Sequence, residues 1–126
     1  MSEDFNIIIF SIDLVFVNIL KRICEEIDKQ LQVAVFQSFS EAGNFRENQS
    51  VNLILVDDLI IGTSSYELIS FLRLHKKITC PVFYFDTSEY ESERKALLIG
   101  ANQFFNKPLN PKKIRQEIKN TLYKMK

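Results

Sequence analysis

Hydrophobic and polar positions along the chain are grouped in blocks rather than alternating residue by residue. Five short apolar runs are separated by longer segments whose apolar side chains recur at helical spacing. The runs are NIIIF (6–10), QVAVF (32–36), NLILV (52–56), PVFYF (81–85) and QFFN (103–106). Because runs without polar alternation are typical of strands buried on both faces, the pattern predicts parallel strands, each followed by a helix.

The segments after the first three runs carry helix signals of different strength. The first is the strongest, since five apolar side chains recur at i, i+3, i+4 and i+7: Phe16, Ile19, Leu20, Ile23 and Ile27. Ser40 is predicted to open a short second helix, and either Ser64 or Ser65 is suited to cap the start of the third.

The last two helices have clearer boundary signals. Ser88 and Glu91 have the spacing of a capping box, and Gly100 is predicted to end that helix. Asn110 is the expected N-cap of the final helix, because Pro111 follows it and proline is well tolerated at the first helical position.

Five strands and five helices in strict alternation predict an α/β fold with three αβα layers. With right-handed crossovers, the simplest arrangement is a doubly wound parallel sheet of order 2-1-3-4-5, which is flavodoxin-like. Ligands of such sheets bind at the carboxyl ends of strands 1 and 3. Asp57 and Asp58 follow strand 3, so we expect them at an open crevice rather than in a sealed core.

Composition and charge restrict the class of protein. The 126 residues are 46% hydrophobic and 25% charged, which suits one domain spanning residues 1–126. The formal net charge is zero, so no basic excess indicates nucleic acid or an anionic membrane as a partner.

The termini and cysteines indicate a cytoplasmic protein. The chain begins MSED, and polar residues interrupt its first apolar stretch, so neither a secretory signal nor a membrane span is predicted. Cys24 and Cys80 lie in apolar contexts without metal-binding spacing, which favours buried free thiols in a reducing compartment.

Two stretches, NLILVD (52–57) and GANQFFNKP (100–108), resemble the bacterial two-component response-regulator receiver domain. The resemblance covers the chain from about residue 5 onward. It implies that Asp57 is the phosphoacceptor for a histidine kinase, that Lys107 is the lysine of the phosphate site, and that Phe104 occupies the aromatic switch position.

The sequence departs from the receiver pattern at the metal site. Receivers end the first strand in two adjacent acids that bind Mg²⁺ together with the acceptor, and these positions are Ser11 and Ile12. Asp13 comes next, but moving it into the metal site would displace the apolar face of the first helix. We therefore expect no cofactor; Asp13 and Asp57 remain weak candidates for metal ligands, and Mg²⁺ is expected only if phosphorylation is retained.

A second departure lies at the end of the fourth strand, where receivers have a Ser or Thr. Counting from Pro81, this position is Asp86, whereas Thr87 would require a one-residue slip of a buried strand. A carboxylate ~4 Å from a phosphoryl dianion costs on the order of a few kcal/mol in a partly screened site. We expect Lys107 to act as a counter-ion for Asp57 or Asp86, and Asp58 to be solvated or to cap the following loop.

These features favour an atypical, or pseudo-, receiver: a signalling module that is not an enzyme and acts through protein–protein interaction without Mg²⁺-dependent phosphorylation. The alternative is a functional phosphoacceptor, phosphorylated on Asp57 by a histidine kinase. A flavin or nucleotide binder is disfavoured because SIDLVF (11–16) offers no glycine. A carboxylate hydrolase would need a base or acid partner, and the single His75 at the end of the third helix is expected at the surface.

The resemblance also suggests where a partner binds. The chain is expected to be a stand-alone receiver without an output domain, and the surface of the fourth helix, fifth strand and fifth helix is the candidate for docking a kinase or downstream protein, or for a homodimer. Its charged residues have mixed sign: Glu91, Arg94, Lys95, Lys112, Arg115 and Lys119.

Overall fold

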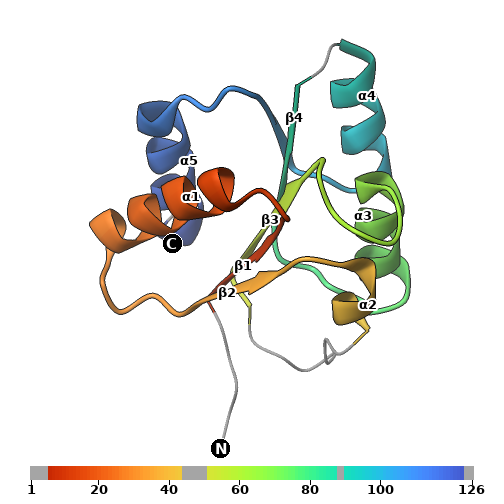
Figure 1. Ribbon diagram of the computed structural model, residues 1–126, viewed down its shortest axis with the longest axis horizontal. Coiled ribbons are helices and arrows are strands. Elements are labelled where there is room, and N and C mark those ends of the chain that lie inside the picture. The colour runs from red at the N-terminus through yellow and green to blue at the C-terminus, as the bar shows by residue number, and fades with distance from the viewer. Residues whose placement is uncertain (1–5, 44–50, 88–89, 124–126) are drawn as a thin grey trace, which may run out of the picture.

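The computed structural model describes residues 6–43, 51–87 and 90–123, and contains the five strands and five helices in alternation (Figure 1). The elements are β1 (Ile7–Phe10), α1 (Leu14–Ile27), β2 (Val33–Phe36), α2 (Phe39–Ala42), β3 (Leu53–Asp57), α3 (Ser65–Leu74), β4 (Val82–Asp86), α4 (Tyr90–Ile99), β5 (Gln103–Asn106) and α5 (Pro111–Tyr123). Strands β3 and β4 end one residue later than predicted, so both Asp57 and Asp86 belong to the sheet.

The five strands form one parallel sheet in the predicted order β2-β1-β3-β4-β5. β1 pairs with β2 and β3, and β3 pairs with β4 in a register that sets Asp57 beside Phe85. Because all strands run in the same direction, their carboxyl ends meet at one edge of the sheet. The loops that follow β1, β3, β4 and β5 therefore gather around Asp57.

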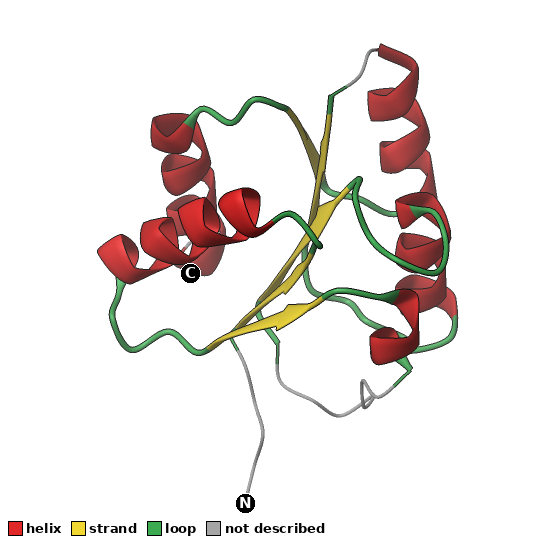
Figure 2. Cartoon of the chain, viewed as in Figure 1, coloured by secondary structure: helices red, strands yellow, loops and turns green. Residues whose placement is uncertain are grey.

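Helices cover both faces of the sheet, α1 and α5 on one side and α2, α3 and α4 on the other (Figure 2). Alternate side chains of each central strand supply the two cores. Ile7 and Ile9 of β1 pack in the core beneath α1 and α5, and Ile8 and Phe10 pack in the core beneath α3 and α4. Each such buried side chain contributes about 1.5–3 kcal/mol of burial free energy, so the central strands form a rigid support.

Capping side chains fix the helix starts near the carboxyl edge. Ser64 accepts from the Glu67 amide and Asn110 from the Lys113 amide, as their positions in the sequence predict. The prediction for the second helix is wrong by two residues: its N-cap is Ser38, with Glu41 completing a capping box, and Ser40 lies inside the helix. The predicted cap Ser88 and the side chain of Glu91 lie outside the described residues.

Gly100 ends α4, as predicted, in a conformation with φ +126° that L side chains rarely adopt. The backbone there lies against Arg73, whose guanidinium donates to the Gly100 carbonyl at 2.8 and 3.1 Å. The same side chain donates to the carbonyls of Ile78 and Cys80. Arg73 thus ties the end of α3 to the end of α4 and to the start of β4.

The two cysteines are free thiols, and the single histidine lies at the surface. Cys24 is buried and Cys80 half-buried, both are free, and burial raises the pKa of each thiol to about 11. His75 is exposed at the C-terminus of α3, where its ring stacks on Phe71.

Within the described ranges, no helix combines the length and the apolar composition that crossing a bilayer requires.

Candidate functional site

Asp57 is the last residue of β3, and none of its surface is exposed to solvent. The expectation of an open crevice at this position is therefore wrong, because the carboxylate is fully buried. A buried carboxylate is costly unless it is paired and hydrogen-bonded. The partners of Asp57 consequently decide what this site can do.

Three donors from three segments of the chain satisfy the Asp57 carboxylate. The Ser11 hydroxyl donates to Oδ2 at 2.6 Å. The Lys107 ammonium donates to Oδ1 at 2.8 Å, and the Asp58 backbone N–H donates to the same oxygen at 2.9 Å. Both oxygens are thus occupied by groups of the protein itself.

Lys107 bridges two carboxylates, but the second is Asp58 and not Asp86. Its ammonium lies 3.1 Å from Asp58 Oδ1 and 5.1 Å from the centre of the Phe16 ring. Burial alone would lower the pKa of Lys107, but the hydrogen bonds and charges of the two aspartates outweigh it and raise the pKa. Burial and the neighbouring Asp57 raise the pKa of Asp58, against the opposing effect of Lys107.

Asp58 is therefore part of the site rather than a solvated neighbour, and the expectation for this residue is wrong. Asp57 and Asp58 share one cation, which partly offsets the cost of placing two acids together. The pairing depends on how the loop after β5 returns Lys107 to the end of β3.

Ser11 and Ile12, which the sequence predicts at the positions of the receiver's acidic pair, have different environments in the structure. The Ser11 side chain is fully buried, and its oxygen also accepts from the Asp13 backbone N–H at 3.0 Å. The Ile12 side chain is 39% exposed, and its backbone N–H donates to the Leu59 carbonyl at 3.0 Å. Ser11 therefore supplies a hydrogen bond where an acid would supply charge, and Ile12 places an apolar side chain at the surface.

Asp13 is the N-cap of α1 and is not directed at the acceptor. One of its carboxylate oxygens accepts from the backbone N–H groups of Val15 and Phe16, at 3.1 and 3.2 Å. A carboxylate at a helix N-terminus is favoured by both the unpaired amides and the helix dipole. The register shift that would have brought Asp13 into a metal site does not occur.

Asp86, which the sequence predicts at the hydroxyl position of receivers, is the last residue of β4, and its carboxylate accepts hydrogen bonds from its chain neighbours. Its Oδ2 accepts from the Tyr84 hydroxyl at 2.8 Å, and its Oδ1 from the Thr87 backbone N–H at 2.6 Å. Burial and the bond to Asp86 raise the pKa of Tyr84 above its usual range. Thr87 is exposed beyond the strand, so β4 does not slip to place its hydroxyl at the site.

Phe104, which the sequence predicts at the aromatic switch position, is half-buried in the core beneath α3 and α4. Its ring lies 5.9 Å from that of Tyr84, which in turn lies 5.4 Å from Tyr66. The ammonium of Lys95 is 4.5 Å above the Tyr66 ring. An aromatic row therefore links β5 to α3 and α4 next to Asp86.

Ser65 contributes to the site, but sequence reasoning considered it only as an alternative helix cap. Its buried hydroxyl donates to the backbone carbonyl of Asp57. This bond holds the end of β3 to the first turn of α3. The sequence contains no signal for this hydrogen bond beyond the two adjacent serines. The bond depends on the path of the loop between β3 and α3.

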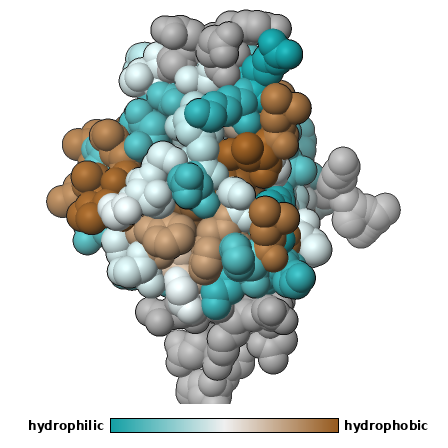
Figure 3. Space-filling model, turned by 90° about the vertical axis from the view of Figure 1, so that its right-hand side faces the viewer, coloured by the Kyte–Doolittle hydropathy of each residue, from teal (hydrophilic) through white to brown (hydrophobic). Residues whose placement is uncertain are grey.

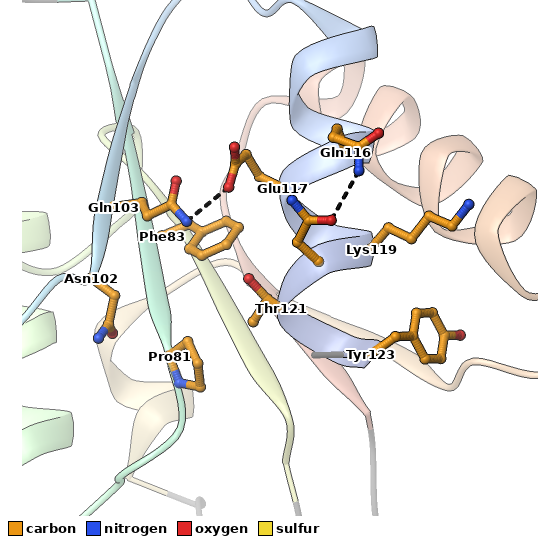
Figure 4. A pocket seen from close by; sticks show the side chains of 10 residues that line it. Pro81, Phe83, Asn102, Gln103, Gln116, Glu117, Lys119, Thr121 and Tyr123 are labelled. Carbon is orange, nitrogen blue, oxygen red and sulfur yellow. Dashed lines mark hydrogen bonds between the residues drawn. The ribbon is translucent and has the colours of Figure 1, made fainter. Parts of the chain in front are cut away.

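Two cavities lie away from Asp57. One of about 710 Å³ opens between α5 and the amino-end halves of β4 and β5, where Gln103 donates to Glu117 and Gln116 donates to Asn120 (Figure 4). Another of about 390 Å³ lies beside β5, between Glu93 and Lys113. Neither is lined by Asp57, Asp58 or Lys107, so neither serves the acceptor.

Residues 7–119 match the family model of the response regulator receiver domain, and the chain belongs to this family. A curated relative, the transcriptional regulatory protein GltR of Pseudomonas aeruginosa, is 26% identical over 106 residues. The match covers 79% of this chain and 44% of the relative, so the chain spans less than half of that protein's length.

Solved structures agree with this fold. A two-component response regulator from Clostridium difficile has a TM-score of 0.82 and 25% identity, with 94% of this chain and 96% of that chain covered. A response regulator described as putative, from Chloroflexus aurantiacus, has a TM-score of 0.80 and 21% identity, with 95% and 98% covered. These similarities place the chain in the αβα receiver architecture.

The magnesium ion implied by the family does not fit the donors present. Mg²⁺ requires oxygen ligands in near-octahedral geometry and is held mainly by carboxylate charge. Here Ile12 has no oxygen in its side chain, Asp13 caps α1, and both oxygens of Asp57 are hydrogen-bonded within the protein. In the described part of the chain, no cluster of three or more acidic, histidine or cysteine side chains is arranged to hold a metal.

Proposed function

We propose that this receiver domain is an atypical signalling module whose output does not depend on Mg²⁺-assisted phosphorylation of Asp57. The observation that carries the proposal is the closed environment of Asp57, which is fully buried and bonded to Ser11, Lys107 and the Asp58 amide. On this proposal Lys107 is a structural counter-ion rather than a phosphate ligand.

The chemistry of phosphoryl transfer supports the proposal. Transfer to a carboxylate requires an unobstructed oxygen and positive charge that neutralises the phosphoryl oxygens. The Ser11 hydroxyl donates to Oδ2 at 2.6 Å, and Lys107, whose ammonium lies 2.8 Å from Asp57, is shared with Asp58. Asp86 adds a carboxylate where a receiver offers a hydroxyl, so an incoming phosphoryl group would meet an extra negative charge.

One observation favours the alternative function, a receiver phosphorylated on Asp57 by a histidine kinase. The acceptor and the lysine are both present, and their side chains lie 2.8 Å apart. For this function the Ser11 contact would have to open to admit the phosphodonor.

A partner protein is the natural target of a receiver without phosphorylation-dependent output. We propose that it docks on the surface formed by α4, β5 and α5, where Arg94, Lys112 and Lys119 are exposed. Arg115 on this surface lies 3.5 Å from Glu26 in an exposed ion pair. The cavity of about 390 Å³ beside β5 lies on the same surface and offers a hollow for a partner side chain. We place this module in the cytoplasm, consistent with its free thiols.

Titration with Mg²⁺ and beryllofluoride, followed by amide NMR spectra, tests the proposal. The wild-type spectrum is expected to remain unchanged around Asp57. The triple variant Ser11→Asp, Ile12→Asp, Asp86→Thr restores the missing groups and is the positive control, which is expected to bind Mg²⁺. A wild-type spectral change that saturates at physiological Mg²⁺ concentration would overturn the proposal in favour of the alternative.

A further inference from the structure

β5 is the last strand of the described sheet, so one of its two edges pairs with no other strand of that sheet. On the paired side, the Lys107 N–H donates to the Asp86 carbonyl of β4 at 2.9 Å. Because successive residues of a strand direct their backbone groups to opposite sides, Phe105 also faces β4, whereas Phe104 and Asn106 face away from it. The N–H and C=O groups of Phe104 and Asn106 thus form a free edge of β5, with which another strand can pair.

The cavity of about 390 Å³ lies along this free edge. Phe104 and Asn106 line it together with Glu93 of α4 and Lys113 of α5. Its volume is within the usual range of ligand sites, about 300–1,000 Å³. Among the described residues on the face that carries α3 and α4, hydrophobic side chains stand in separate groups between hydrophilic ones (Figure 3). An occupant bound mainly through its backbone suits this surroundings better than one bound through a broad apolar face.

We propose that an extended, acidic segment of a partner protein binds in this cavity and pairs with the free edge of β5 as an added strand. The inference rests on the proposed function for its docking surface, α4–β5–α5, and adds the mode of binding and the chemistry of the partner. An extended segment advances ~3.3 Å per residue, so four residues of it cover the 4 residues of β5. In this mode backbone hydrogen bonds supply affinity, and alternate side chains of the segment enter the hollow.

The exposed charges of α5 favour an acidic segment. Its single acid, Glu117, is half-buried and accepts from the Gln103 side chain at 3.1 Å. Four basic side chains of the helix are exposed, and one of them, Arg115, is paired with Glu26. The four are Lys112, Lys113, Arg115 and Lys119. The helix beside the free edge therefore carries an excess of positive charge, which attracts an acidic partner.

The same features disfavour other occupants. A second copy of this chain, paired edge to edge about a two-fold axis, would set the basic side chains of α5 near those of its copy. A nucleic acid would satisfy the charge but has no peptide groups to pair with Phe104 and Asn106. Only a polypeptide meets both the charge and the free backbone groups.

Amide NMR titration with a short blocked peptide of alternating Val and Glu residues, in the absence of Mg²⁺, tests the inference. Saturable shifts are expected at β5, with slower hydrogen exchange at the Phe104 and Asn106 N–H groups. Asn106→Pro removes one of these donors and is expected to raise the peptide dissociation constant roughly tenfold. Proline suits this position, since it is tolerated at a strand edge whose N–H faces solvent.

Asn106→Ala is the matched control, because it loses the same side chain but keeps the N–H, and it is expected to bind like the wild type. Thermal melting confirms that both variants are folded, and hydrogen exchange of the wild type is a readout independent of either variant. A peptide of alternating Val and Lys residues is the control for charge and is expected to bind more weakly.

Absence of saturable binding would overturn the inference, as would equal binding by Asn106→Pro and Asn106→Ala or a preference for the Lys peptide. Self-association of the wild type that Asn106→Pro abolishes would also overturn it, by assigning the free edge to a second copy. None of these results alters the response of Asp57 to Mg²⁺ and beryllofluoride, so failure of this inference is distinguishable from failure of the proposed function.

Discussion

At the scale of single residues, the site is a buried carboxylate held by one lysine. Lys107 is the cation within hydrogen-bond distance of Asp57, and its side chain is 13% exposed. Removing one partner of a buried pair leaves an uncompensated charge, which typically costs 3–5 kcal/mol. Lys107→Met is therefore expected to lower the free energy of unfolding by about 3 kcal/mol, measured by urea denaturation.

The variant Asp57→Asn provides the matched control for this prediction. An amide in place of the carboxylate removes the charge, so adding Lys107→Met to Asp57→Asn should cost much less than Lys107→Met alone. Equal costs in the two backgrounds would show that the ion pair does not stabilise the fold.

The raised pKa of Lys107 predicts a loss of stability at alkaline pH. A lysine whose pKa is higher in the folded state than in the unfolded state stabilises the fold fully below its ordinary pKa of 10.5. That contribution is lost as the pH rises through the folded-state value. The stability difference between wild type and Lys107→Met should therefore shrink in urea titrations carried out above about pH 10.5, and a difference that stays constant would contradict the assignment.

Ser11 should contribute through its bond to the same carboxylate. A hydrogen bond to a charged group is worth about 1.5–3 kcal/mol, and Ser11→Ala removes one at 2.6 Å inside the core. The variant is expected to lose roughly 2 kcal/mol of unfolding free energy in urea denaturation. A loss comparable to that of an exposed serine would show that the bond is weak.

The sequence predicted part of the site. Asp57 and Lys107 could be identified because their motifs lie at strand ends, which the apolar runs locate. The pairing of Lys107 with Asp58 could not, since it depends on the path of the loop after β5. The sequence left Asp57 and Asp86 as alternative partners of Lys107. The ammonium pairs with Asp57, whereas Asp86 accepts from Tyr84, two residues earlier on the same face of β4.

At the scale of elements, α1 begins directly after its N-cap Asp13, whose carboxylate accepts hydrogen bonds from two backbone N–H groups of the first turn. Asp13→Ala is expected to cost about 1 kcal/mol of unfolding free energy, as for other N-cap removals, without changing the Mg²⁺ response. Circular dichroism melts in the presence and absence of Mg²⁺ measure both effects. If the Asp13→Ala substitution changed the Mg²⁺ response, Asp13 of the wild type would have to be a metal ligand.

Gly100, at the end of α4, is expected to be sensitive to substitution. A Cβ at this position would lie 2.9 Å from Arg73 Cγ, in a backbone conformation that L side chains rarely adopt. Gly100→Ala should therefore cost on the order of 1–3 kcal/mol. Gly43→Ala is the matched control, since Gly43 ends α2 with φ −66°. The melting temperature of the Gly43→Ala variant should fall by less than that of the Gly100→Ala variant.

The elements themselves were predictable because apolar runs and helical spacing are local signals. The ends of the elements depended on distant partners. β3 extends to Asp57 because this residue pairs with Phe85 of β4, and the second helix begins at Ser38 because Glu41 bonds back to its amide. Neither contact is visible in the local pattern of apolar positions.

At the scale of the whole molecule, the sheet order followed from alternation and crossover handedness, and it correctly predicted that the carboxyl ends of β1 and β3 lie side by side. What the order could not predict is whether that edge is open. The closure arises from Ser11, Lys107 and the Asp58 amide acting jointly on one carboxylate. On the proposed function, this closure prevents Mg²⁺-dependent phosphorylation of Asp57.

Intact mass spectrometry after incubation with acetyl phosphate tests that claim most directly, with and without Mg²⁺ and with Asp57→Asn as the control. We expect the wild type to show no phosphoryl adduct that depends on Mg²⁺. A stoichiometric adduct that requires Mg²⁺ and disappears in Asp57→Asn would contradict the account and establish the chain as a working phosphoacceptor.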